Sequence, residues 1–140
     1  VHAVATAAVP KFTIITGGSF GAGNYAMSGR AFNPRLLFTC PLSRIAVMGA
    51  EQAANVLMSI RKKKVNAGDA SVMAEQDESA FSRDNIIARY NYESSPYYSA
   101  SRIWDDGIID PADMRTILAL GISMSLNKKF PEPENPIYRM

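Results

Sequence analysis

The chain has 140 residues, of which 47% are hydrophobic and 20% charged, so it fits one domain of ordinary size and not a long disordered segment. Lys and Arg number 15 against 13 Asp and Glu, and a net charge of +2 gives no basic footprint for nucleic acid. One Cys and one His exclude an internal disulfide and argue against a Cys/His zinc site or a His-dependent catalytic unit. No apolar run approaches the ~20 residues that span a bilayer, so no membrane is expected.

Both ends suggest a piece of a longer protein. The chain begins at Val1 inside an Ala-rich stretch that is typical of the middle of a helix. It finishes in a Pro-rich segment that is typical of a terminal tail, which we place at residues 127–140. We therefore interpret residues 1–140 as one partial, C-terminal domain.

The first half of the chain alternates short apolar runs with small residues and turns. β-Branched and aromatic residues closed by Gly17 and Gly18 are typical of a buried strand. In chain order we predict a helix over 1–8 that ends by Pro10, a strand at 11–16, a glycine-rich turn at 19–25, a helix over 26–29, and strands at 35–40 and 43–48.

The second half is mainly helical. A helix that begins after Gly49 has apolar residues at the spacing of one buried face, namely Ala53, Val56, Leu57 and Ile60. Another helix is predicted over 81–93, and the chain restarts at Pro96. After a very short strand at 108–109, Asp110 is placed as an N-cap with Pro111 at the first helical position. The helix that follows, to about 126, has a wide apolar face formed by Met114, Ile117, Leu118, Gly121 and Ile122.

Strands that alternate with helices predict an α/β fold with a largely parallel sheet. Only three or four strands are present, which is few for a complete sheet and agrees with a partial domain.

The segment at 12–29 is the one most able to support chemistry. Glycine permits positive φ and close approach of a ligand to the backbone. A helix that starts there would present unpaired N–H groups to an anion or to an oxyanion formed during a reaction. No Gly-Lys-Ser/Thr and no Gly-x-Gly-x-x-Gly is present, so a nucleotide phosphate loop is disfavoured. The simpler alternative, that these glycines only allow a tight turn and close packing, stays open.

Several blocks together resemble the carboxyltransferase (β) subunit of biotin-dependent acyl-CoA carboxylases. Within that family the Gly-Ala-Gly-Asn-Tyr sequence at 21–25 is most similar to methylcrotonoyl-CoA carboxylases, because propionyl-CoA and acetyl-CoA relatives usually have Ala-Tyr-Asp near this point. The resemblance covers nearly the whole chain and is weakest at 61–93. The matching blocks are 17–30, 33–35, 44–57, 96–113 and the final 139–140.

The resemblance implies a crotonase-like (ClpP/crotonase superfamily) fold and places the chain at the C-terminal portion of the second carboxyltransferase domain. It implies transfer of CO2 from N1 of biotin to the γ-carbon of 3-methylcrotonoyl-CoA, in leucine catabolism. Biotin would be delivered by a partner α subunit that also holds the ATP site, and the β subunits would form the hexamer core of an α6β6 complex. The active site would lie between two β subunits, so this chain alone is expected to be inactive. The implied location is the mitochondrial matrix, or the cytoplasm in a bacterium.

The resemblance also assigns roles to residues of the glycine-rich segment. The N–H groups of Ala22 and Gly23 would form the oxyanion hole for the biotin ureido oxygen, and Gly21 would shape the turn. Phe20 and Asn24 would border the biotin pocket. Tyr25 occupies a position that influences the choice of acyl chain. No metal is expected.

Other candidates have simpler readings. The basic run at 61–64 could contact CoA phosphates or the α subunit, but a solvated helix end is the more common role of such a run. Cys40 is expected as a small buried hydrophobic residue, and His2 as incidental. Asp105 and Asp106 are expected in a turn and not on a metal. Tyr97, Tyr98 and Trp104 are expected to pack at a domain or subunit contact.

Three functions remain open on the sequence alone. The first is the biotin-binding half of a methylcrotonoyl-CoA carboxyltransferase. The second is another subunit of the same fold, either a decarboxylase or a propionyl-CoA or acetyl-CoA carboxylase. The third is a crotonase-like module that only supports assembly.

Overall fold

A computed structural model describes residues 1–68 and 82–132. The chain divides into two compact units, which we treat separately. The first contains Val1–Ile45 and the described residues from Ser95 onward, and the second contains Ala46–Ser94. Of the predicted tail at 127–140, only 127–132 lies within the described residues.

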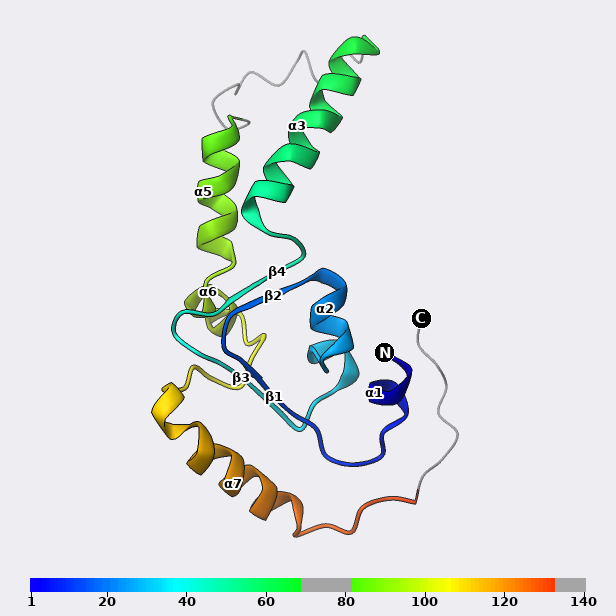
Figure 1. Cartoon of the computed structure of the whole chain (residues 1–140), viewed down its shortest axis with the longest axis vertical. Helices are drawn as coiled ribbons and strands as arrows, with labels where there is room; N and C mark the ends of the chain where they lie inside the picture. Colours follow the sequence, from blue (N-terminus) through cyan, green and yellow to red (C-terminus); the bar gives the residue numbers. More distant parts are fainter. Residues whose placement is uncertain (69–81, 133–140) are drawn as a thin grey trace. The chain divides into compact units, whose positions relative to one another are not determined.

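Short parallel pairing organises the first unit. β1 (Phe12–Ile15) pairs in parallel with β3 (Leu36–Thr39), and Thr39 makes a further parallel bridge to Ile108. β2 (Gly18–Phe20) pairs with β4 (Arg44–Ala46), which ends at the boundary of the unit (Figure 1). The predicted α/β class and its parallel strands are confirmed, and the short strand predicted at 108–109 is reduced to a single bridge residue, Ile108.

The helices of the first unit are mostly short. α1 (His2–Thr6) ends well before Pro10, as predicted, and α6 (Pro96–Ser101) begins with Pro96 behind a Ser95 side-chain cap. A 3-10 turn, η1 (Arg30–Phe32), follows the glycine-rich segment.

The helix predicted over 26–29 is wrong in its position. The structure has α2 at Gly21–Ala26, directly after β2 (Figure 1). Gly21 takes a φ of 51°, which lets the chain turn from strand into helix at once. The residues expected to be helical end the helix instead, because Ser28 adopts a left-handed conformation with φ of 62°.

α7 (Met114–Ser125) packs against the parallel strands. Its cap is as predicted, since the Asp110 carboxylate accepts the Ala112 N–H at 2.8 Å, but a 3-10 turn, η2 (Pro111–Asp113), precedes the helix proper. A Cβ added at the buried Gly121 would lie 2.8 Å from the ring of Phe12. α7 therefore depends on a glycine at this point to approach β1.

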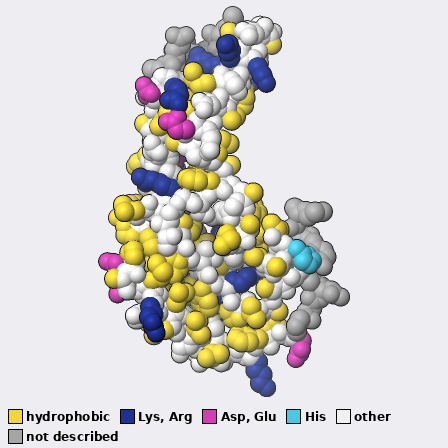
Figure 2. All heavy atoms as spheres, viewed as in Figure 1, with side chains coloured by type: hydrophobic (Ala, Val, Ile, Leu, Met, Phe, Trp, Pro, Cys, Tyr) yellow, Lys and Arg dark blue, Asp and Glu magenta, His cyan; other side chains and the backbone are white. Residues whose placement is uncertain are grey.

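The wide apolar face predicted for α7 is only partly buried. Gly121 is buried, but Ile122 is 52% exposed. Further apolar residues of the helix and of the segment that follows are also exposed. Hydrophobic side chains are spread over the visible face of the first unit (Figure 2). Four short strands cannot cover a helix on more than one side. The exposed apolar residues here are Leu120, Ile122, Met124, Leu126 and Phe130.

The second unit is a pair of packed helices, α3 (Ala50–Asn66) and α5 (Arg83–Glu93). Ala53, Ala54 and Ile86 are buried, and an ion pair joins Arg83 to Glu51. The predicted buried face is wrong for Val56, Leu57 and Ile60, which are 36–45% exposed. α5 is the one described element of this unit that packs along α3, so only a narrow line of alanines is covered. The basic run at 61–64 lies in the last turns of α3, with Lys63 and Lys64 exposed, as expected for a solvated helix end.

Two aspartates anchor the segment after α6 to β3. Asp106 accepts the Leu37 N–H at 2.7 Å and pairs with Arg30 at 3.3 Å. Asp105 is buried and accepts the Ser99 hydroxyl at 2.8 Å. The prediction that these aspartates serve a turn is confirmed, and the structure adds that they hold the turn to a strand.

Replacing Asp106 with Ala should destabilise the intact protein by about 1–3 kcal/mol, because the N–H of the buried Leu37 would lose its acceptor. Arg30→Ala is the matched control. It removes a half-exposed ion pair, which is worth about 0–1 kcal/mol, and the exposed hydrogen bond from Arg30 Nε to the Trp104 carbonyl, but it leaves the Leu37 N–H bonded to Asp106. Chemical denaturation would compare the two variants, and equal losses would contradict this account of Asp106.

Candidate functional site

The β2–α2 junction presents backbone N–H groups at an accessible helix start. Phe20 is the N-cap of α2 and provides no side-chain hydrogen bond. The N–H groups of Ala22 and Gly23 lie in the first turn, where a helix has no internal acceptor for them. Both residues are exposed, and neither N–H has an acceptor within the described part of the chain. A Cβ added at Gly23 would meet no atom within 4 Å, so the space on that side of the residue is open.

The side chains named by the sequence gather around this junction. Phe20 is 38% exposed and its ring covers Gly18, where an added Cβ would come within 2.7 Å of it. The half-exposed Tyr25 stands edge-on to Phe32, with ring centroids 5.8 Å apart. Both aromatic rings remain accessible to a ligand. The Asn24 carboxamide, in contrast, is turned towards the protein and donates to the Ser19 hydroxyl at 2.9 Å.

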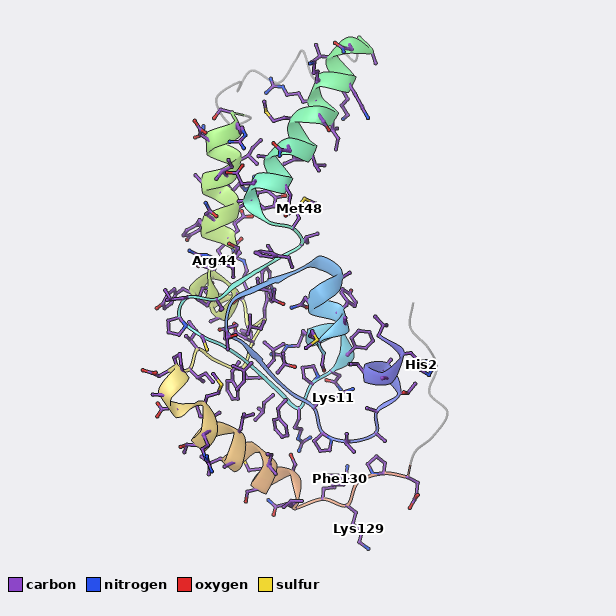
Figure 3. All side chains as sticks on the ribbon, viewed as in Figure 1. His2, Lys11, Arg44, Met48, Lys129 and Phe130 are labelled. Carbon is purple, nitrogen blue, oxygen red and sulfur yellow. The ribbon has the colours of Figure 1, made fainter. Side chains whose placement is uncertain are left out.

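A cavity of about 440 Å³ lies elsewhere in the first unit, and the sequence did not indicate it. It is lined by segments around Pro10, Pro34 and Phe130, and its lining includes Lys11 and Lys129 (Figure 3). None of these lining segments belongs to the glycine-rich segment at 17–30. The Lys11 ammonium is already used, because it donates to the Val4 carbonyl at 2.9 Å.

The other candidates take structural positions. Cys40 is buried, as predicted. Tyr98 lies edge-on to Trp104 at 5.9 Å and has the Arg102 guanidinium 3.6 Å from its ring centroid, while Tyr97 is exposed. That these aromatic residues pack at a domain or subunit contact stays a prediction. Within residues 1–68 and 82–132, no three His, Cys, Asp or Glu side chains are placed to bind a metal. None of the described helices is long and apolar enough to cross a membrane.

Comparison with known proteins decides what this junction belongs to. Residues 1–137 match the model of the carboxyl transferase domain. The chain belongs to the carboxyl transferase domain family.

The relatives of this carboxyl transferase chain are similar along all of it. It is 46% identical over 140 residues to the biotin-dependent 3-methylcrotonyl-coenzyme A carboxylase beta1 subunit of Mycobacterium tuberculosis, covering 100% of the chain and 26% of the relative. It is 48% identical over 140 residues to a probable mitochondrial methylcrotonoyl-CoA carboxylase beta chain of Drosophila melanogaster, covering 100% and 24%. The chain thus spans about a quarter of the length of the curated relatives that it matches.

Solved structures agree with the fold. The beta subunit of Pseudomonas aeruginosa geranyl-CoA carboxylase matches with a TM-score of 0.75 at 34% identity, over 99% of this chain and 26% of that one. Transcarboxylase 12S, described as a hexamer assembly, matches with a TM-score of 0.72 at 32% identity, over 99% and 24%. The predicted family and the crotonase-like fold class are confirmed.

Sequence reasoning missed the residues that hold the carboxyl transferase junction in place. Ser19 was treated only as part of a turn, yet it is the hydrogen-bond partner of Asn24. Gly29 was treated as a helix residue, yet it is buried against Asn24. The one local signal for the role of Ser19 is that a small polar residue follows two glycines. Nothing in the neighbouring sequence indicates the role of Gly29.

Proposed function

We propose that the intact protein is the carboxyltransferase subunit of a biotin-dependent acyl-CoA carboxylase that acts on 3-methylcrotonoyl-CoA. The observation that supports this most is the 46–48% identity, along the whole chain, to methylcrotonoyl-CoA carboxylase beta chains of a bacterium, an insect, a plant and an amoeba. The Gly-Ala-Gly-Asn-Tyr sequence at 21–25 falls within that match.

In this proposal the β2–α2 junction receives the biotin ureido group. Bound carboxybiotin supplies the carboxyl group and, once that group has left, a base for the γ-carbon of the acyl-CoA. The N–H groups of Ala22 and Gly23 donate to the ureido oxygen and stabilise the negative charge that develops there. One such donor is typically worth about 10²–10³ in rate. The exposure of both residues and the open space at Gly23 support this role.

The neighbouring side chains shape the pocket. Phe20 borders the biotin ring with its accessible face, and Asn24 borders the same pocket from α2. Tyr25, held edge-on by Phe32, faces the acyl chain. Gly21 makes the turn possible, through its positive φ. No imidazole or thiol has a part, which agrees with the distance in sequence of His2 and the burial of Cys40.

The proposal includes partners that the chain cannot supply itself. A partner α subunit carries biotin and the ATP site, and acyl-CoA is held chiefly by the first domain of another β subunit. A β hexamer at the core of an α6β6 complex is supported by the hexamer assembly described for transcarboxylase 12S. The mitochondrial relatives support a matrix location, and the mycobacterial relative supports a cytoplasmic one if the source is bacterial.

Carboxylation assays on the intact protein with its biotin-carrying partner test the proposal. The panel is 3-methylcrotonoyl-CoA, geranyl-CoA, propionyl-CoA and acetyl-CoA, with kcat/KM measured for each. We expect 3-methylcrotonoyl-CoA to have the highest kcat/KM. A preference for propionyl-CoA or acetyl-CoA would move the protein to another branch of the family, and no transfer to any of the four would leave it an assembly module.

A further inference from the structure

The side chain of Asn24 joins α2 to the strand before it. Its Nδ2 group donates to the hydroxyl of Ser19 in β2, at 2.9 Å. Both residues are only partly exposed, so this hydrogen bond lies mostly out of solvent. It links the middle of β2 to the middle of α2, across the turn at Gly21.

The main chain of Asn24 is hydrogen-bonded as well. The main-chain oxygen of Asn24 accepts the Gly29 N–H at 2.8 Å. A Cβ added at Gly29 would overlap Asn24 Oδ1 and lie 2.8 Å from the Asn24 main-chain oxygen. Since Gly29 is buried and its φ of −64° is one that any residue adopts, it is close packing against Asn24 that requires glycine here.

The end of α2 is tied to β1 as well. The Thr13 hydroxyl donates to the Ser28 carbonyl at 2.8 Å, and Ser28 lies in the left-handed turn that ends the helix. α2 and the turn that ends it are thus bonded to two strands, to β2 through Asn24 and to β1 through Ser28. We call Ser19, Asn24 and Gly29 the α2 latch.

α2 needs such a latch because the helix is weak alone. It has six residues and no side-chain cap, and helices much shorter than about 12 residues are marginal in water. Its direction is consequently set by what it is bonded to. Any change in that direction moves the N–H groups of Ala22 and Gly23 together.

We propose that Asn24 is a positioning residue for carboxyl transfer, which acts through Ser19 and Gly29 by fixing the direction of α2. This inference rests on the proposed function of the junction and deepens it. Asn24 borders the pocket, but its carboxamide is committed to the protein, so its loss affects the rate of the reaction more than the affinity for biotin.

The test uses the intact subunit with free biotin as carboxyl acceptor and a carboxylated acyl-CoA as donor. The variants are Asn24→Leu, which keeps the size of the side chain, Ser19→Ala, and the double variant. A misplacement of reacting groups by about 1 Å can cost about 10²-fold. We expect each single variant to lower kcat by about 10–10²-fold with KM for biotin unchanged, and the double variant to be no worse than the poorer single one. Ser19→Thr, which keeps the hydroxyl, should recover most of the kcat.

Hydrogen exchange on the same proteins gives a readout that does not depend on activity. Amides of residues 27–29, which donate to main-chain carbonyls of α2, should exchange faster in Asn24→Leu and in Ser19→Ala than in the parent. A raised KM for biotin with kcat unchanged, or losses that multiply in the double variant, would overturn the positioning role and make Asn24 a direct biotin contact. Unchanged exchange would overturn the latch itself. Failure of the unmodified subunit to transfer a carboxyl group would instead count against the proposed function, with the exchange result still deciding the latch.

Discussion

Replacement of Ala22 by Pro is expected to lower carboxyl transfer by about 10²–10³-fold in the intact complex, without loss of assembly. Ala22 is the second residue of α2, and proline is tolerated in the first turn of a helix, where its missing N–H has no acceptor in the helix. The side chain at this position is exposed, so the ring meets little packing. The substitution therefore removes one proposed oxyanion donor and little else.

Steady-state rates and size-exclusion chromatography check both parts of this expectation. Ala22→Ser is the matched control, since it changes the exposed side chain and keeps the N–H; it should stay close to the parent rate. If Ala22→Pro assembles and transfers carboxyl groups at the parent rate, the N–H of Ala22 has no part in the reaction. If the serine variant is equally damaged, the side chain and not the donor is responsible.

Replacement of Gly21 by Val should cost about 10²-fold in kcat and also destabilise the protein. Gly21 turns the chain from β2 into α2 with φ of 51°, a conformation that costs an L-residue roughly 1–2 kcal/mol and a β-branched residue more. Relief of that strain requires rotation of the backbone at the residue before both proposed donors. The N–H groups of Ala22 and Gly23 would then point away from their common target.

Gly17→Val provides the comparison for Gly21→Val. Gly17 is exposed, is not among the glycines with positive φ, and an added Cβ there meets nothing within 4 Å. Rates and melting temperatures of the two variants should differ clearly, with Gly17→Val near the parent in both. Similar behaviour would show that bulk in this region, and not the backbone conformation of Gly21, limits activity.

The sequence was sufficient for elements whose signals are local. The strand at β1, the Asp110 cap and the burial of Cys40 follow from residue type and spacing over a few positions. The start of α2 was misplaced because a positive φ at one glycine, and not hydrophobic periodicity, decides where that helix begins. The local composition does not indicate which of the neighbouring glycines adopts the positive φ.

Burial was the least predictable property. Periodicity placed Val56 on an apolar face of α3 and Ile122 on an apolar face of α7. It did not indicate that the described elements leave both residues exposed. Periodicity reports which side of a helix is apolar, while burial depends on what lies against it. The relatives are about four times longer than this chain, which agrees with apolar surface that the described residues do not cover.

The low content of His and Cys agrees with a site that is built from backbone groups. One His and one Cys argue against imidazole or thiol chemistry within these 140 residues, whereas the start of α2 has exposed backbone N–H groups. The side-chain chemistry of this segment is instead used to hold the backbone, as the contacts of Asn24 show.

A crystal structure of the intact protein with biotin bound tests the central claim most directly. The account predicts the ureido oxygen within roughly 2.7–3.1 Å of the nitrogen atoms of both Ala22 and Gly23, with α2 as it is here. Biotin bound away from the β2–α2 junction, or with its ureido oxygen directed to other donors, would contradict it.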